Sequence, residues 1–429
     1  MTIIDMYVNV RLNLYKKIKL GGWKMLRDTL RRNKGITLIA LVVTIIVLLI
    51  LAGISIAMLT WQNGILNRAS EAKEKTRVAQ EDENEKLQGY EKIINQYAEN
   101  LPIGEDTTPY LPNSTFSKKE GDLATGLVIK DNNDNEYVWV EVPTTIYDNT
   151  TYNNNGAKKP SNSEDYTNIE ACLKFYTKDY SDSNYSDTNS KFTEQYQAML
   201  KSVYTNGGFW IGRYEAGLEG GKNPRTSYVA ISASDKAVIK PNMYPYNYVT
   251  RDEAQTLAQK MDYGDCKGSL IFGIQWDLTL KYIEEKTVEL AEEANKDTVR
   301  TDIKNKLTSN STRIGNYKDN LWSITNTNAK CSTNSGSSYT ACPNPYTKTS
   351  SSNILLTTGA DTSFSLMNIY DLAGNVWEWT LEFYDTSGPC AYRGGSYNNS
   401  GSDIPAKSRS SGDTSDYGDG LGFRVGLWK

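Results

Sequence analysis

The stretch NIYDLAGNVWEWT, residues 368–380, places an acid between two tryptophans. Trp377 and Trp379 flank Glu378, and successive side chains of an extended segment point to opposite faces. We therefore expect a strand that packs two indole rings on one face and directs a carboxylate to the other. Gly374, just before it, permits backbone conformations that other residues resist.

Two shorter motifs follow and frame a polar segment. RGG at 393–395 and GFR at 422–424 each place an arginine beside glycine and an aromatic residue. We expect Arg393 and Arg424 to be buried guanidinium groups that fix loop ends through several hydrogen bonds. Between them lie mainly Ser, Gly, Asp, Asn and Tyr, the adaptable residues of binding loops. The segment 396–421 is thus predicted to be a surface held by a fixed framework.

Together with GFWIGRYEAG at 208–217, these motifs resemble the formylglycine-generating enzyme (sulfatase-modifying factor) family in order and spacing. The resemblance covers residues 115–429 and implies an irregular α+β domain with a C-type-lectin-like fold. The rest of this region agrees with that class, because short apolar runs alternate with polar loops too long for a compact α/β sheet protein. We expect a hairpin turning at 132–135 and helices at 250–261 and 272–285.

The family resemblance also implies a calcium ion at this motif. Its ligands by motif position are Asp371, Gly374, Val376 and Glu378. Two carboxylates and two backbone carbonyls would supply only oxygen, which suits a hard cation such as calcium. A purely structural role for Asp371 is the alternative.

The catalytic groups of the family are not found at their expected places. Oxidising members use a cysteine pair just after the RGG motif to bind copper, and iron-dependent relatives use histidines. This chain has no histidine, and its Cys390 lies before the motif. We therefore assign no catalytic residue and expect neither copper nor iron. An enzyme of the formylglycine-generating type with relocated ligands remains the alternative.

Five cysteines form no CxxC motif, which argues against a zinc ribbon or a thioredoxin-type redox site. If two of them pair, Cys331 and Cys342 are the best-placed couple.

The same fold serves as the target scaffold of diversity-generating retroelements, which mutate adenines and most often change asparagine codons. Such changes never yield Glu, Gln, Met or Trp, and residues 396–421 contain none of these; only Lys407 departs from the pattern. The alternative explanation of this pattern is a general bias in amino-acid composition, since 148–166 and 178–192 are also rich in Tyr, Asn and Ser. The predicted ligand-binding face comprises Tyr392, Tyr397, Asn399, Asp403, Ile404, Lys407, Ser408, Ser410, Ser411, Asp413, Asp416, Tyr417, Asp419 and Leu421.

The first 60 residues have a different character from the rest of the chain. Residues 1–35 carry nine Lys or Arg and two Asp, a net charge of +7, which leaves −11 for the remainder. Residues 36–59 are uncharged and, at ~1.5 Å per residue, long enough to cross a hydrocarbon core of ~30 Å. We expect a single transmembrane helix at 36–60, with the basic end in the cytoplasm and the C-terminal domain outside the cell.

The join RRNKGITLIALVV resembles a type IV prepilin leader, cleaved between Gly35 and Ile36 by prepilin peptidase. Ala40 stands where the family usually has glutamate, which puts assembly with other pilin-like subunits in doubt. Met25 offers a second start that would give a short leader, and an ordinary signal anchor is the alternative. The expected organisation is a basic leader at 1–35, the membrane helix at 36–60, a helical stalk at 61–101, a linker at 102–114 and the domain at 115–429.

The sequence as a whole predicts a membrane-anchored, pilin-like display protein whose C-terminal face binds a protein or glycan at a surface. A net charge of only −4 gives no nucleic-acid footprint.

Overall fold

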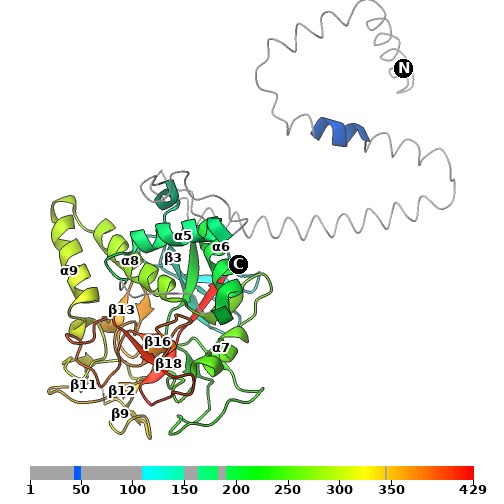
Figure 1. Cartoon of the computed structure of the whole chain (residues 1–429). Helices are drawn as coiled ribbons and strands as arrows, with labels where there is room; N and C mark the ends of the chain where they lie inside the picture. The colour runs from blue at the N-terminus through cyan, green and yellow to red at the C-terminus, as the bar shows by residue number, and fades with distance from the viewer. Residues whose placement is uncertain (1–42, 50–108, 149–162, 182–189, 344) are drawn as a thin grey trace, which may run out of the picture. The chain divides into compact units, whose positions relative to one another are not determined.

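The computed structural model describes residues 43–49, 109–148, 163–181, 190–343 and 345–429 (Figure 1). The chain divides into two compact units, 1–101 and 102–429. Residues 43–49 of the first unit are helical and lie within the expected membrane span. No helix in the described ranges is long and apolar enough to cross a membrane. The expected leader with Gly35 and Ile36, most of the span and the stalk lie outside these ranges.

The core of the second unit is a six-stranded antiparallel sheet in the order β1-β2-β3-β4-β19-β7. Its strands are β1 Ser117–Glu120, β2 Val128–Lys130, β3 Glu136–Glu141, β4 Gly208–Gly212, β7 Lys267–Leu270 and β19 Val425–Trp428. The predicted hairpin is confirmed, since Lys130 pairs with Glu136 across the turn. The C-terminal strand β19 lies between β4 and β7, so the end of the chain forms an interior strand that joins β7 to the rest of the sheet.

A second sheet carries the motifs and has the order β17-β16-β15-β18. Its strands are β15 Trp377–Trp379, β16 Cys390–Arg393, β17 Arg409–Gly412 and β18 Leu421–Phe423. Strand β18 runs parallel to β15, and Arg424 alone separates it from β19 in the main sheet. The GFR motif therefore joins the two sheets.

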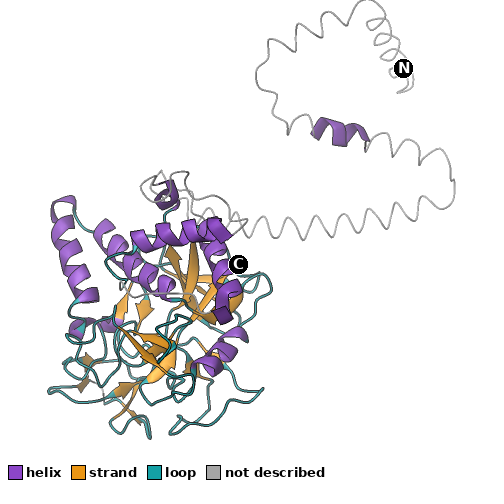
Figure 2. Ribbon diagram, viewed as in Figure 1, coloured by secondary structure: helices purple, strands orange, loops and turns teal. Residues whose placement is uncertain are grey.

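Five helices are described in the second unit: α5 Ser163–Tyr176, α6 Thr193–Asn206, α7 Arg251–Gln259, α8 Gly273–Glu289 and α9 Lys296–Thr308. Both predicted helices, α7 and α8, are present. Thr250 caps α7 through a capping box with Glu253. Helices α6 and α8 pack against the main sheet, and α8 is buried along most of its length. Most of the helices gather at one end of the unit, and loops with short strands form the other (Figure 2).

Short strands brace the loop-rich end. They are β5 Gly217–Leu218, β6 Ala237–Val238, β8 Ser323–Ile324, β9 Lys330–Ser332, β10 Thr340–Ala341, β11 Tyr346–Thr347, β12 Leu355–Leu356, β13 Ser365–Leu366 and β14 Ile369–Tyr370. Residues 109–114, in the segment expected to be a linker, lie against the main sheet. Tyr110 packs edge-on against Trp139, with ring centroids 5.5 Å apart, and its carbonyl accepts a bond from Trp210 Nε1.

Candidate functional site

Arg424 is fully buried at the junction of the two sheets. Its Nε lies 2.9 Å from Glu378 Oε2, its Nη1 donates to the carbonyl of Gly212, and its Nη2 donates to the carbonyl of Tyr370. One guanidinium thus bonds to strands β4, β14 and β15. The prediction of a buried, framework-fixing arginine is confirmed here.

Arg393 fixes the beginning of the polar segment in the same way. It is 1% exposed and pairs with Asp277 of α8 and with Glu382, while its Nη1 donates to the carbonyl of Lys407 at 2.7 Å. Glu382 also pairs with Arg409 at the start of β17. The backbone between RGG and β17 is therefore held at both ends by buried ion pairs.

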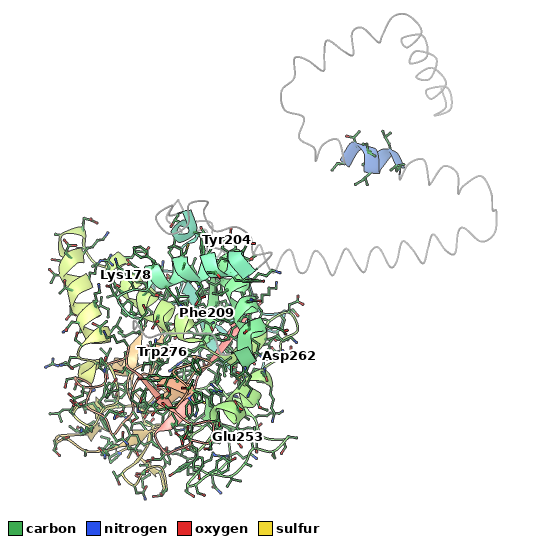
Figure 3. The ribbon with its side chains drawn as sticks, viewed as in Figure 1. Lys178, Tyr204, Phe209, Glu253, Asp262 and Trp276 are labelled. Atoms are coloured by element: carbon green, nitrogen blue, oxygen red, sulfur yellow. The ribbon has the colours of Figure 1, made fainter. Side chains whose placement is uncertain are left out.

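Close packing around Gly394 completes this clamp. Gly394 has a φ of +92°, and a Cβ there would come within 3.0 Å of the Trp276 ring and 2.9 Å of the Leu372 carbonyl. The glycine is required on both grounds. Trp276, near the centre of the unit in Figure 3, also donates from Nε1 to the carbonyl of Ala406. Trp276 thus fixes the backbone of the segment between Gly394 and β17 from the side of the core.

The motif strand β15 has the predicted alternation. Trp377 and Trp379 both meet the Tyr392 ring edge-on, at centroid distances of 5.0 and 5.2 Å, while Glu378 faces Arg424. Tyr392 lies opposite Ser410, and their hydroxyls are 3.3 Å apart. Trp379 is fully buried, but Trp377, Tyr392 and Ser410 are half-buried. This sheet face therefore passes from core to partly exposed surface.

The residues of the predicted ligand-binding face differ in exposure. Asp403, Asp413, Asp416 and Tyr417 are exposed. Half-buried are Tyr392, Asn399, Ile404, Lys407, Ser408, Ser410, Ser411, Asp419 and Leu421. The most exposed members lie between β16 and β18, as expected of a surface segment.

Tyr397 does not belong to the exposed face, and its assignment as a ligand anchor was wrong. It is 2% exposed, its hydroxyl donates to the carboxylate of Asp419, and its amide donates to the carbonyl of Asn375. Burial raises the pKa of Tyr397 above its usual range. The ring packs with Leu355 and Val376 in a small hydrophobic cluster, so it stabilises the segment from inside.

A cluster of buried acids surrounds Arg424. Glu215 accepts bonds from the amide of Val376 at 3.0 Å and the side chain of Asn375 at 2.7 Å, and Asp371 accepts from the amide of Gly359 at 2.6 Å. Burial raises the pKa of Asp371 to about 7, and that of Glu215 well above its usual range. Sequence reasoning missed Glu215, although it lies in the quoted GFWIGRYEAG motif.

The two carboxylates among the expected calcium ligands, Asp371 and Glu378, already have other partners. Both carboxylate oxygens of Glu378 bond to Arg424, Asp371 bonds to the backbone, and the guanidinium supplies positive charge among the acids. In the ranges that the structure describes, no group of three His, Cys, Asp or Glu side chains is arranged to hold a metal ion. Because Arg424 and the amide of Gly359 already engage the two predicted carboxylate ligands, this arrangement does not favour a calcium ion.

All five cysteines are buried, and one pair of them lies together. Cys390, the one nearest the RGG motif, lies on β16 in the core. Cys331 and Cys342 come together in a separate hydrophobic cluster with Trp322, Ile324 and Phe364. The five thiols of the chain therefore do not place a cysteine pair beside the RGG motif.

These features define a class: an α+β domain in which buried arginines hold a polar C-terminal surface. Residues 193–427, more than half of the chain, match the sulfatase-modifying factor enzyme 1-like domain, and the chain belongs to that family. This confirms the family resemblance.

Two solved structures are similar to the chain, both at low identity. One is Treponema denticola variable protein 1, at 16% identity over 52% of this chain and 85% of that chain, with a TM-score of 0.27. The other is titled Crystal Structure of CarF, at 14% identity over 52% of this chain and 87% of that chain, with a TM-score of 0.28. No curated protein matches the chain.

Proposed function

We propose that the protein is a non-catalytic display protein whose C-terminal face, about residues 392–421, binds a protein or glycan ligand. One observation carries the proposal. Buried ion pairs hold both ends of the segment, and the exposed side chains of the segment take no part in these ion pairs. Arg393 and Arg424 bond to core acids and carbonyls, whereas Asp403, Asp413 and Tyr417 are exposed. Side chains there can change without removing a framework bond.

The chemistry of the exposed residues suits recognition. Serine and aspartate offer adaptable hydrogen-bond partners, and tyrosine adds a rigid, amphipathic contact at low conformational cost. The C-type-lectin-like fold implied by the family motifs supports the same role. The half-buried rings of Trp377 and Tyr392 lie in β15 and β16, between β17 and β18 in the same sheet, and add apolar area for contact.

Diversification of this face by a retroelement is part of the proposal. Its support is the residue pattern from 396 to 421, which lacks Glu, Gln, Met and Trp, residues that such changes of asparagine codons cannot yield, and departs from the pattern only at Lys407. The test is to sequence the coding region across many cells of one population. Substitutions confined between Arg393 and Gly422 are expected, and substitutions spread evenly over the domain would contradict diversification.

The non-catalytic part of the proposal rests on the residues of the chain. There is no histidine, and no second cysteine accompanies Cys390 near the RGG motif. The test is to titrate the protein with copper in the presence of a cysteine-containing peptide. We expect no conversion of the cysteine to formylglycine, and turnover would favour the oxidase alternative.

We also propose that the domain is displayed outside the cell from a pilin-like membrane anchor. The support is the basic block at 1–35, the uncharged run at 36–59 and the prepilin-like join at Gly35 and Ile36. Co-expression with a prepilin peptidase should yield a new N-terminus at Ile36, and a Gly35→Leu variant should stay uncut. An intact chain in both cases would leave an ordinary signal anchor.

A further inference from the structure

Exposed apolar side chains of the second unit concentrate at one place. In its described residues the exposed large apolar side chains are Tyr228, Val229, Leu290, Leu321 and Tyr417. Tyr228 and Tyr417 stack with ring centroids 4.5 Å apart and planes 20° from parallel, and Val229 follows Tyr228 directly. Tyr228 and Tyr417 thus come together although they belong to segments far apart in the sequence, and the exposed Val229 is the chain neighbour of Tyr228.

The loop at 219–236, between β5 and β6, brings Tyr228 to this place and is well anchored. Tyr228 donates from its hydroxyl to Glu253 at 3.0 Å, and Ile231 donates from its amide to the same carboxylate oxygen at 3.1 Å. Arg225 donates to the carbonyl of Tyr248 at 2.9 Å. Glu253, labelled in Figure 3, is itself fixed by the capping box of α7. The position of Tyr228 is therefore set by the framework.

The other half of the pair is anchored through the backbone around Tyr417. The amide of Tyr248 donates to the carbonyl of Gly418 at 2.9 Å, and Asn247 donates from its side chain to the carbonyl of Asp419 at 2.8 Å. Tyr417 is thus held against Tyr228 of the loop at 219–236, which lies outside the proposed face at 392–421.

We infer that Tyr228 and Val229 are a constant part of the ligand-binding surface, next to the variable Tyr417, and that the ligand is a protein segment with a large apolar side chain beside lysine or arginine. This inference rests on the proposed function and adds residues and a ligand class to it.

The exposed groups favour a protein segment over a glycan. Val229 is 64% exposed and aliphatic, so it gains from contact with an apolar side chain. Tyr228 covers one face of the Tyr417 ring, so only the opposite face could stack on a sugar. Asp413 and Asp416 are exposed on the same loop as Tyr417, and residues 410–423 contain no lysine or arginine. The loop at 219–236 carries Lys222, Arg225 and Lys236 against Glu219 and Asp235, so the acidic side of the surface lies at Tyr417 and favours a basic group of the ligand there.

The test uses a phage-displayed library of random peptides, panned against the full-length protein. Enriched sequences should combine a large apolar residue with Lys or Arg. A synthetic peptide of the enriched sequence is then titrated against wild type and variants by fluorescence anisotropy. Val229→Asn should raise Kd about tenfold or more, because it removes apolar contact area. The control Leu290→Asn changes an apolar side chain that is 54% exposed at the end of α8, and it should leave Kd within about twofold.

A third variant separates this inference from the proposed function. If Ser410→Arg weakens binding while Val229→Asn does not, the C-terminal face binds ligand without the 219–236 loop, and the inference fails alone. If neither variant changes Kd, both fail. A library that yields no binder, or a protein that binds only a glycan array, contradicts the protein ligand class.

Discussion

Replacing Asp371 by asparagine should make the domain more stable, and the gain should grow with pH. Asp371 is 2% exposed beside Glu378 and Arg424, and burial is the main cause that raises its pKa to about 7. Its φ of +56° lies in the left-handed region, which asparagine tolerates well. An asparagine oxygen can also accept the bond from the amide of Gly359.

The expected size follows from the shift in pKa. An acid whose pKa is raised on folding lets the folded state lose stability as pH rises from the unfolded value, 3.8, through the folded value of about 7. With ~1.4 kcal/mol per pKa unit, this loss is about 0.5 kcal/mol at pH 4 and about 4 kcal/mol at pH 8. Asp371→Asn removes the loss, so its advantage over wild type should grow by about 3–4 kcal/mol between these pH values.

Urea unfolding followed by tryptophan fluorescence at pH 4 and pH 8 measures this difference. Asp403→Asn is the matched control, since that carboxylate is exposed, and its effect should stay within about 0.5 kcal/mol at both pH values. If the difference in unfolding free energy between wild type and Asp371→Asn does not change with pH, the pKa of Asp371 is not raised by burial, and the reasoning is refuted.

Three further predictions concern the framework. Arg424→Met should lower the free energy of unfolding at pH 7 by about 3–5 kcal/mol, because it leaves Glu378 buried without its partner, whereas the exposed Arg313→Met should cost under about 0.5 kcal/mol; equal losses would contradict this. Calcium should not raise the melting temperature, since a ligand stabilises only the state that binds it, and a dose-dependent rise would restore the calcium site. Oxidised glutathione should remove two hydrogens from the protein by joining Cys331 and Cys342, because a hydrogen bond from Cys342 lowers the pKa of Cys331 to about 6; an unchanged mass, or glutathione bound to either thiol, would contradict this.

The framework could be predicted from sequence because its signals are local. Alternation around Glu378, and arginines beside glycine, identify side chains that must be buried whatever the surrounding topology. The capping residue Thr250 likewise marks α7.

Other features depend on contacts between distant segments. Tyr397 lies among small polar residues, as a tyrosine of a binding loop does. In the structure it is buried and packs with Leu355 and Val376, which are distant in the sequence. Nothing in the sequence around Tyr228 indicates a binding role. Only its stacking on Tyr417 in the folded domain connects it with the proposed ligand-binding surface. Helices α5, α6 and α9 were not predicted; α6 and α9 begin without a side-chain cap, the local signal that marks α7.

The most direct test of the central claim is a saturation mutagenesis scan of residues 392–424, with folded protein measured by protease resistance. The account predicts broad tolerance at Asp403, Asp413 and Tyr417 and rejection of nearly all changes at Arg393 and Arg424. Uniform intolerance along the segment, or free replacement of the two arginines, would contradict a framework that holds a variable surface.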